Sequence, residues 1–188
     1  RRKHSRKTEA DNNAFWSREA AANSVRRKDI SQLPYIRIPF EELPFIPDAA
    51  GEIKTCQNQL LALKGIPLLN LSSMSNTDLK MEYGVANLPK LSECDEACNN
   101  MYRIIANLGY YLSKEGYHDE SVAFLEFGIR AGSDLSRNYY VLADEYLLAH
   151  RYDDVRQLTE HAESITTPMK SAIIRELTGK LASTEVKP

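Results

Sequence analysis

Hydrophobic residues recur at helical spacing through the second half of the chain. From residue 97 they follow one another at intervals of three and four, which is the pattern of a helix that buries one face. The first run comprises Ala97, Met101, Ile104, Ile105, Leu108, Tyr111 and Leu112. We predict that Ser92 and Asp95 open this helix as a capping box and that Gly116 ends it.

The same spacing predicts further helices down to the C-terminal region. Their ranges are 119–131, closed by Gly132, then 135–149, 153–165 and 168–181. Thr167 and Pro168 suit the cap and the first turn of the last of these. Because the connections are short, neighbouring helices should be antiparallel. The side chains expected in the core are Ile105, Leu108, Leu112, Val122, Leu125, Tyr139, Leu142, Tyr146 and Leu158.

Two helices are predicted in the N-terminal part of the chain. Residues 8–27 have helical character but only a thin apolar stripe, so this helix either docks on another surface or stays loose. Residues 49–64 form a helix of about four turns, with Asp48 as its N-cap and Gly65 after its end.

The stretch between this helix and Ser92 has a mixed pattern. A short helix is predicted at 77–83 and is closed by Gly84. A loop is expected to follow through Pro89.

Residues 29–47 contain too many prolines for a helix. Pro34, Pro39, Pro44 and Pro47 each bias the preceding residue toward extended backbone. Between them stand Tyr35, Ile36, Ile38, Phe40, Leu43, Phe45 and Ile46, which are too apolar for a disordered linker. We therefore expect an extended Pro-rich strap whose apolar side chains lie along the helical body.

The helices from residue 102 onward repeat along the sequence at a constant interval. A shift of 34 aligns Ile105, Leu108, Gly109, Leu112, Ser121 and Gly128 with Tyr139, Leu142, Ala143, Tyr146, Val155 and Ala162, without gaps. Small residues recur at matching places, where they let paired helices approach closely. The turn that contains Gly116 aligns with the turn that contains His150.

This pattern resembles the tetratricopeptide repeat, a hairpin of two helices that recurs at the same interval. The repeats are placed at 102–135 and 136–169, and a capping helix at 168–181 follows. Val155 and His150 depart from the alanine and glycine usual at their positions. The resemblance implies an all-α fold, a superhelix of antiparallel helical hairpins preceded by the strap, with residues 48–188 as the helical domain.

The resemblance also implies a ligand-binding face. In this family the first helix of each hairpin lines a concave surface that holds peptides or partner proteins, and Ala106 is expected on that surface. The anchor residues expected there are Arg103, Tyr110, Lys114, Arg137, Tyr140 and Asp144. A carboxylate clamp for chaperone tails would need lysine and asparagine at Ala106 and Tyr110, so such tails are not the expected ligand. The alternative is that these are packed surface residues.

Charge is distributed unevenly along the chain. Residues 1–28 carry nine basic and three acidic side chains, a net charge of +6, whereas the remainder carries −8. A basic arm of this kind suits an anionic surface, and Arg1, Arg2, Lys3, Arg6 and Lys7 are the contacts expected. The alternative is a solvated tail.

The sequence offers no recognisable catalytic chemistry. Cys94 and Cys98 lie four apart on one helix, which is not a redox spacing, and they are interpreted as small buried residues. The four histidines form no metal-binding or nucleophile pattern, and no phosphate-binding glycine loop is present. We therefore expect no enzymatic activity, no catalytic residue, no cofactor and no metal.

Two functions fit these observations. The first is a cytoplasmic protein-binding or scaffolding module, tethered to a membrane by a segment upstream of Arg1, because Arg1, Arg2 and Lys3 resemble the cytoplasmic flank of a transmembrane helix. The second is a nucleic-acid-associated factor that uses the basic arm. Nucleic acid is the less expected partner, since Trp16 is the only aromatic residue near the basic cluster apart from Phe15.

Overall fold

The chain folds entirely into helices and the segments that connect them. A computed structural model describes the backbone of residues 2–185 and the side chains of residues 10–184, and this part contains no β-strand. Its elements are α1 (Arg2–Asn23), α2 (Gly51–Leu61), α3 (Asn76–Tyr83), the 3₁₀ turn η1 (Val85–Asn87), α4 (Leu88–Lys114), α5 (His118–Arg130), α6 (Ser136–Leu148), α7 (Tyr152–Ala162) and α8 (Lys170–Glu185). The predicted all-α class is confirmed.

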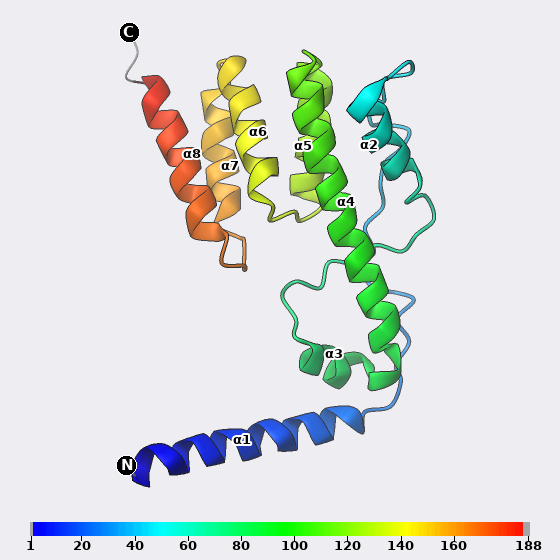
Figure 1. Cartoon of the computed structure of the whole chain (residues 1–188), viewed down its shortest axis with the longest axis vertical. Coiled ribbons are helices and arrows are strands. Elements are labelled where there is room, and N and C mark those ends of the chain that lie inside the picture. The colour runs from blue at the N-terminus through cyan, green and yellow to red at the C-terminus, as the bar shows by residue number, and fades with distance from the viewer. Residues whose placement is uncertain (1, 186–188) are drawn as a thin grey trace.

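The long helix α4 organises the molecule (Figure 1). Its C-terminal half packs against α2 on one side and against α5 and α6 on the other, while its N-terminal half extends toward α3. The helices α4, α6 and α8 are neighbours in that order, since α6 contacts both of the others. The helix α5 contacts α4 and α6, and α7 contacts α6 and α8, so each fills the space between two of them.

Three hydrophobic clusters form the core of the described chain. The first joins α2, α4 and α5 and contains Leu108, and the second joins α5 to α8 and contains Leu142. The third joins α3 to the N-terminal half of α4 and contains Leu91. Eight of the nine side chains predicted to be buried are buried. Val122 is the exception: it is only half-buried and packs on the margin of the second cluster.

The hairpin turns of the body repeat in backbone geometry as the sequence repeats. Gly116 and His150, which the sequence repeat aligns with each other, both have positive φ angles, of 85° and 57°. The amide after each donates to a carbonyl five residues earlier, from Tyr117 to Leu112 at 2.9 Å and from Arg151 to Tyr146 at 2.8 Å. Residues of different type therefore give the two turns the same backbone geometry.

Four predicted helix starts are wrong. The helix α1 starts at Arg2 rather than at residue 8, and it ends at Asn23 rather than at residue 27. The helix α4 begins at Leu88 rather than at Ser92, because Pro89 lies in its first turn, where a missing N–H costs nothing. Asp95 is not part of a capping box. Its carboxylate accepts a hydrogen bond from the Leu71 amide at 2.8 Å and so holds the preceding loop against α4.

The other two errors also concern side-chain caps. The N-cap of α2 is Ala50, which has no side-chain cap hydrogen bond, so Asp48 does not cap this helix. The helix α8 starts at Lys170, and the Thr167 hydroxyl has no hydrogen-bond partner in the described part of the chain. In both cases the chain makes a turn or bend before the helix begins.

Residues 29–47 lie against the helical body without forming a helix or a strand. The Ile36 amide donates to the Leu68 carbonyl at 2.8 Å in an isolated bridge. The Gln57 side chain pairs with both backbone groups of Ile46, at 2.7 and 3.0 Å. Phe45 packs edge to face on Phe124, with ring centroids 5.3 Å apart. This segment therefore contributes apolar side chains to the first cluster.

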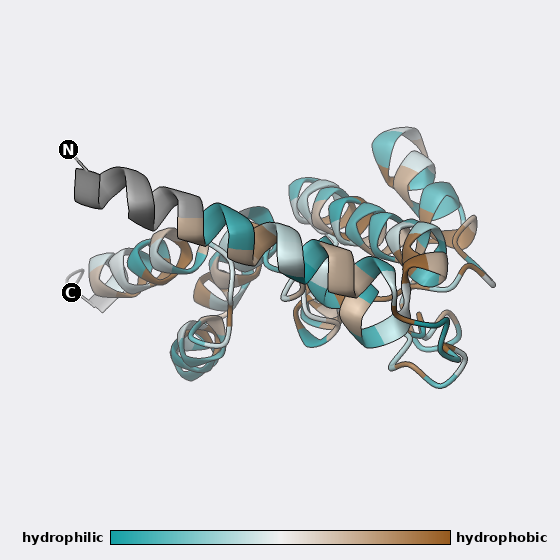
Figure 2. Ribbon diagram, turned by 90° about the horizontal axis from the view of Figure 1, so that it is seen from below, coloured by the Kyte–Doolittle hydropathy of each residue, from teal (hydrophilic) through white to brown (hydrophobic). Residues whose placement is uncertain are grey.

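The helix α1 projects along the end of the molecule and contacts α3 (Figure 1). Ion pairs link Arg18 to Asp78 at 2.5 Å and Glu19 to Lys80 at 2.9 Å. Ala22 is fully buried at this contact. Figure 2 shows that hydropathy alternates along the described part of α1 without a continuous apolar stripe, so polar contacts carry much of its attachment.

Candidate protein-binding face

The face formed by α4 and α6 brings an aromatic ring and two cations together. The Lys114 Nζ lies 5.4 Å from the centroid of the Tyr110 ring, and the Arg137 Cζ lies 5.4 Å from the same centroid. Lys114 reaches the ring because it stands one helical turn after Tyr110 on α4. Arg137 reaches it because α6 packs beside α4.

Arg137 is further held by a neighbouring amide. Its Nη1 donates to the Asn107 Oδ1 at 2.6 Å, and Asn107 stands almost one turn before Tyr110 on α4. The guanidinium is thereby fixed beside the ring while both cationic side chains remain exposed. A ring with two cations beside it is a preformed contact for a carboxylate or for another aromatic group.

The acidic residue predicted on this face is neutralised from α8. The Asp144 Oδ1 accepts from the Lys180 Nζ at 2.6 Å, and Lys180 also lies 3.8 Å from Glu176. Sequence reasoning missed Lys180, which stands 36 residues from Asp144. Asp144 is thus paired, whereas no ion pair of Lys114 or Arg137 with a described carboxylate is present.

The remaining predicted face residues have different environments. Arg103 is exposed on α4 and makes no hydrogen bond or ion pair with the described residues. Tyr140 is half-buried and packs against the second cluster. Ala106 is buried, with 3% of its surface exposed, so its expected place on the ligand-binding surface is wrong. Leu148, at the end of α6, is 62% exposed.

The side chains of the predicted anionic-surface contacts lie outside the described part of the chain. Arg1 is not described at all, and the structure describes the helical backbone but not the side chains of Arg2, Lys3, Arg6 and Lys7. The next part of α1 carries Phe15 and Trp16, which are 53% and 67% exposed. Their rings form an edge-to-face pair with centroids 5.3 Å apart. Two large aromatic side chains thus stand in solvent close to the basic sequence.

The cysteines are buried inside the helical body. Cys56, Cys94 and Cys98 are free thiols, and burial raises the pKa of Cys98 to about 11. The hydroxyl of Tyr102, which is also buried, donates to the Ala131 carbonyl at 2.6 Å, and burial raises its pKa as well. Because thiolate is the reactive form, these thiols are poorly suited to nucleophilic chemistry.

In the described part of the chain, no group of three or more His, Cys, Asp or Glu side chains could hold a metal ion. Among the described helices, none is both long and apolar enough to span a lipid bilayer.

Comparisons with known proteins identify no relative of this chain. No family model, no curated protein and no solved structure matches it.

Proposed function

We propose that this chain is a non-enzymatic protein-binding module of the tetratricopeptide type, in which the face of α4, α6 and α8 holds an acidic segment of a partner protein. The observation that carries the proposal is the Tyr110 ring with the exposed cations of Lys114 and Arg137 beside it. Arg and Tyr are the residue types that most often anchor protein interfaces.

The repeated backbone geometry supports the family part of this proposal. The turns at Gly116 and His150 match in φ and in hydrogen bonding, and their separation along the chain equals the period of that repeat. Two hairpins alone would be a short array, since such folds need about three units. Here α2 and residues 29–47 cover the side of α4 that α5 and α6 leave free, and so take the place of a third helical hairpin.

The charge of the face specifies the class of ligand. Lys114 and Arg137 are exposed, and the acidic residue of this face, Asp144, already pairs with Lys180. A carboxylate-rich segment would gain charge-assisted hydrogen bonds without displacing that pair. We therefore expect the partner sequence to contain Asp or Glu, with an aromatic residue to stack near Tyr110.

Binding of acidic peptides should depend on the two cations. A fluorescein-labelled peptide of Glu and Asp around one Tyr should bind, and a matched peptide with Lys in place of each acid should not. The double variant Lys114→Ala/Arg137→Ala should lower the affinity for the acidic peptide at least about tenfold, because each charge-assisted hydrogen bond contributes about 1.5–3 kcal/mol. Fluorescence polarisation measures both affinities.

Arg130→Ala provides the matched control. This exposed arginine lies on α5, near α7, and its guanidinium is 3.8 Å from Glu126. Its removal alters the net charge without touching the face. The single variant Arg137→Ala removes the same charge from the face. Equal weakening by Arg130→Ala and by Arg137→Ala would show only non-specific attraction and would contradict the proposed site.

We further propose that the N-terminal arm places this module at the cytoplasmic surface of a membrane, to which an upstream segment would tether it. The supporting observation is the exposed Phe15 and Trp16 pair beside the basic sequence. Aromatic side chains favour the interface between headgroups and acyl chains, and basic residues favour anionic lipid. Binding of nucleic acid by the same arm is the alternative.

Trp16 makes the membrane proposal directly measurable, because it is the only tryptophan. Vesicles with anionic lipid should shift its fluorescence emission to the blue at low ionic strength, and neutral vesicles should not. Salt at about 0.5 M should reverse the shift, because the Debye length then falls to a few Å and the attraction between the basic residues and the anionic lipid is screened. Replacement of Arg1, Arg2, Lys3, Arg6 and Lys7 by Gln should abolish it.

The control for the arm is a variant with Lys54→Gln and Arg130→Gln, two basic residues of the helical body. It should bind vesicles like the unaltered chain. Duplex DNA provides the competing ligand under the same conditions. Tighter binding of DNA than of anionic vesicles would favour the nucleic-acid alternative and contradict a membrane role.

A further inference from the structure

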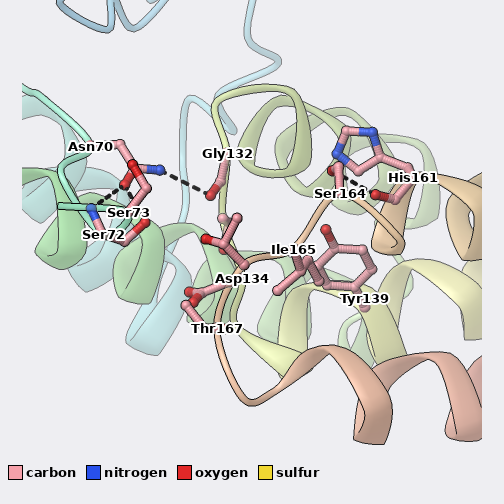
Figure 3. Close-up of a pocket in the computed structure, with 12 residues that line it drawn as sticks. Asn70, Ser72, Ser73, Gly132, Asp134, Tyr139, His161, Ser164, Ile165 and Thr167 are labelled. Carbon is pink, nitrogen blue, oxygen red and sulfur yellow. Dashed lines mark hydrogen bonds between the residues drawn. The ribbon is translucent and has the colours of Figure 1, made fainter.

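A polar pocket lies at the turn end of the helical body, beside the start of α6. The turns between α5 and α6 and between α7 and α8 form two of its walls, and residues 70–73 form the third (Figure 3). Its volume is about 270 Å³. Sites for drug-sized ligands measure about 300–1,000 Å³, so this pocket suits a single side chain or a molecule of similar size.

A hydroxyl without a partner points into this pocket from a buried residue. Tyr139 is 1% exposed, and its hydroxyl makes no hydrogen bond with the described residues. Figure 3 shows the hydroxyl directed toward the turn that carries His161 and Ser164. Burial raises the pKa of Tyr139 to about 12, with a smaller contribution from the charge of Asp134. The hydroxyl makes no bond within the described chain and opens onto the pocket, so it is free to bond a ligand there.

Among the lining residues that are not fully exposed, two more carry unpaired groups. The Asp134 carboxylate makes neither a hydrogen bond nor an ion pair with the described residues, although Asp134 is only partly exposed. The Thr167 Oγ1 is buried in the adjoining wall, also without a partner. Other polar groups nearby are already engaged, since the Asn70 Nδ2 donates to the Gly132 carbonyl and the Ser164 hydroxyl donates to the His161 carbonyl.

The free groups define the chemistry of a ligand. No Lys or Arg lines the pocket, and its single carboxylate is Asp134. The Tyr139 oxygen can accept a hydrogen bond. A ligand that donates hydrogen bonds and carries a positive charge can therefore pair with the Asp134 carboxylate and with the Tyr139 hydroxyl.

We propose that this pocket binds an alkylammonium or guanidinium group. Such a group could come from a Lys or Arg side chain of a partner protein or from a free small molecule. The site is independent of the proposed function, because it uses the helix turns and none of the residues of the α4 and α6 face. One chain could thus recognise an acidic segment on one surface and a basic group on another.

The test is a titration of the ¹⁵N-labelled full chain followed by NMR. Agmatine represents the free cation, and acetyl-Gly-Arg-Gly-amide represents a side chain within a peptide. Either should shift the amides of residues 132–135 and 164–167 at concentrations up to about 10 mM. Tighter binding of the peptide would assign the site to a partner protein, and tighter binding of agmatine would assign it to a small molecule. Glycerol, which is neutral, should cause no such shifts.

Two variants separate ligand binding from structure. Asp134→Asn should weaken binding at least about tenfold, because the ion pair with the ligand is lost. Tyr139→Phe should also weaken it while the melting temperature of the free chain stays equal or rises, because an unpaired hydroxyl is removed. Asp119→Asn, an exposed carboxylate on α5 outside the pocket, should leave binding unchanged.

The proposal fails if neither cation shifts these amides, if glycerol shifts them equally, or if Asp134→Asn binds like the unaltered chain. Loss of acidic-peptide binding in the Lys114→Ala/Arg137→Ala variant has no bearing on it. That variant should still bind agmatine at the pocket, which distinguishes failure of this site from failure of the face.

Discussion

Replacement of Leu108 by alanine should lower the free energy of unfolding by about 2–5 kcal/mol, the range for removing a buried leucine. Leu108 is 0% exposed and lies in the first hydrophobic cluster, where α2, α4 and α5 meet. Its removal would leave a cavity that three helices would have to close together. Chemical denaturation followed by circular dichroism measures the change.

Leu148→Ala is the matched control for this prediction. The same side chain is removed from a residue that is 62% exposed, so a change of less than about 0.5 kcal/mol is expected. Similar effects at the two positions would show that the cluster around Leu108 does not stabilise the fold as described.

Removal of residues 1–47 should destabilise the chain by more than about 3 kcal/mol, since burial of one large apolar side chain contributes about 1.5–3 kcal/mol and several are lost together. The side chains of this segment that pack on the first cluster are Ile36, Ile38, Phe40, Leu43, Phe45 and Ile46. Removal of residues 1–24 alone should have a much smaller effect, because α1 contacts α3 and adds only Ala22 to the buried residues.

The midpoint of thermal unfolding compares the two truncated chains. An unchanged midpoint after removal of residues 1–47 would show that the segment is only a linker. If that chain does not fold, Phe45→Ala addresses the same contact, because the Phe45 ring packs directly on Phe124. Its effect should exceed that of Phe15→Ala, a ring that is 53% exposed.

The periodic helices of the body could be predicted from sequence to within a few residues. The apolar spacing and the glycines at 116 and 132 fixed the ends of α4 and α5, where both glycines have positive φ angles. Helix starts were predicted less well. Ser92 and Asp95 fit a capping box, but α4 starts earlier, with Pro89 in its first turn. The Asp95 carboxylate instead accepts a hydrogen bond from the Leu71 amide of the preceding loop.

In the candidate sites too, contacts within one helix could be predicted from sequence, whereas contacts between helices could not. Tyr110 and Lys114 share one turn of α4, so sequence alone could pair them. The contact of Arg137 with Asn107 and that of Lys180 with Asp144 join residues 30 and 36 apart, and both depend on helix packing. The polar pocket gave no sequence signal, because Asp134, Tyr139 and Thr167 converge only through the positions of two turns.

The central claim is that the face of α4, α6 and α8 holds an acidic segment of a partner protein. The most direct test is an NMR titration of the ¹⁵N-labelled chain with the acidic Tyr-containing peptide. We expect amide shifts confined to residues 103–114, 137–148 and the part of α8 around Lys180, and their loss in the Lys114→Ala/Arg137→Ala variant. Absence of shifts at these residues, or shifts confined to α5 and α7, would contradict the claim.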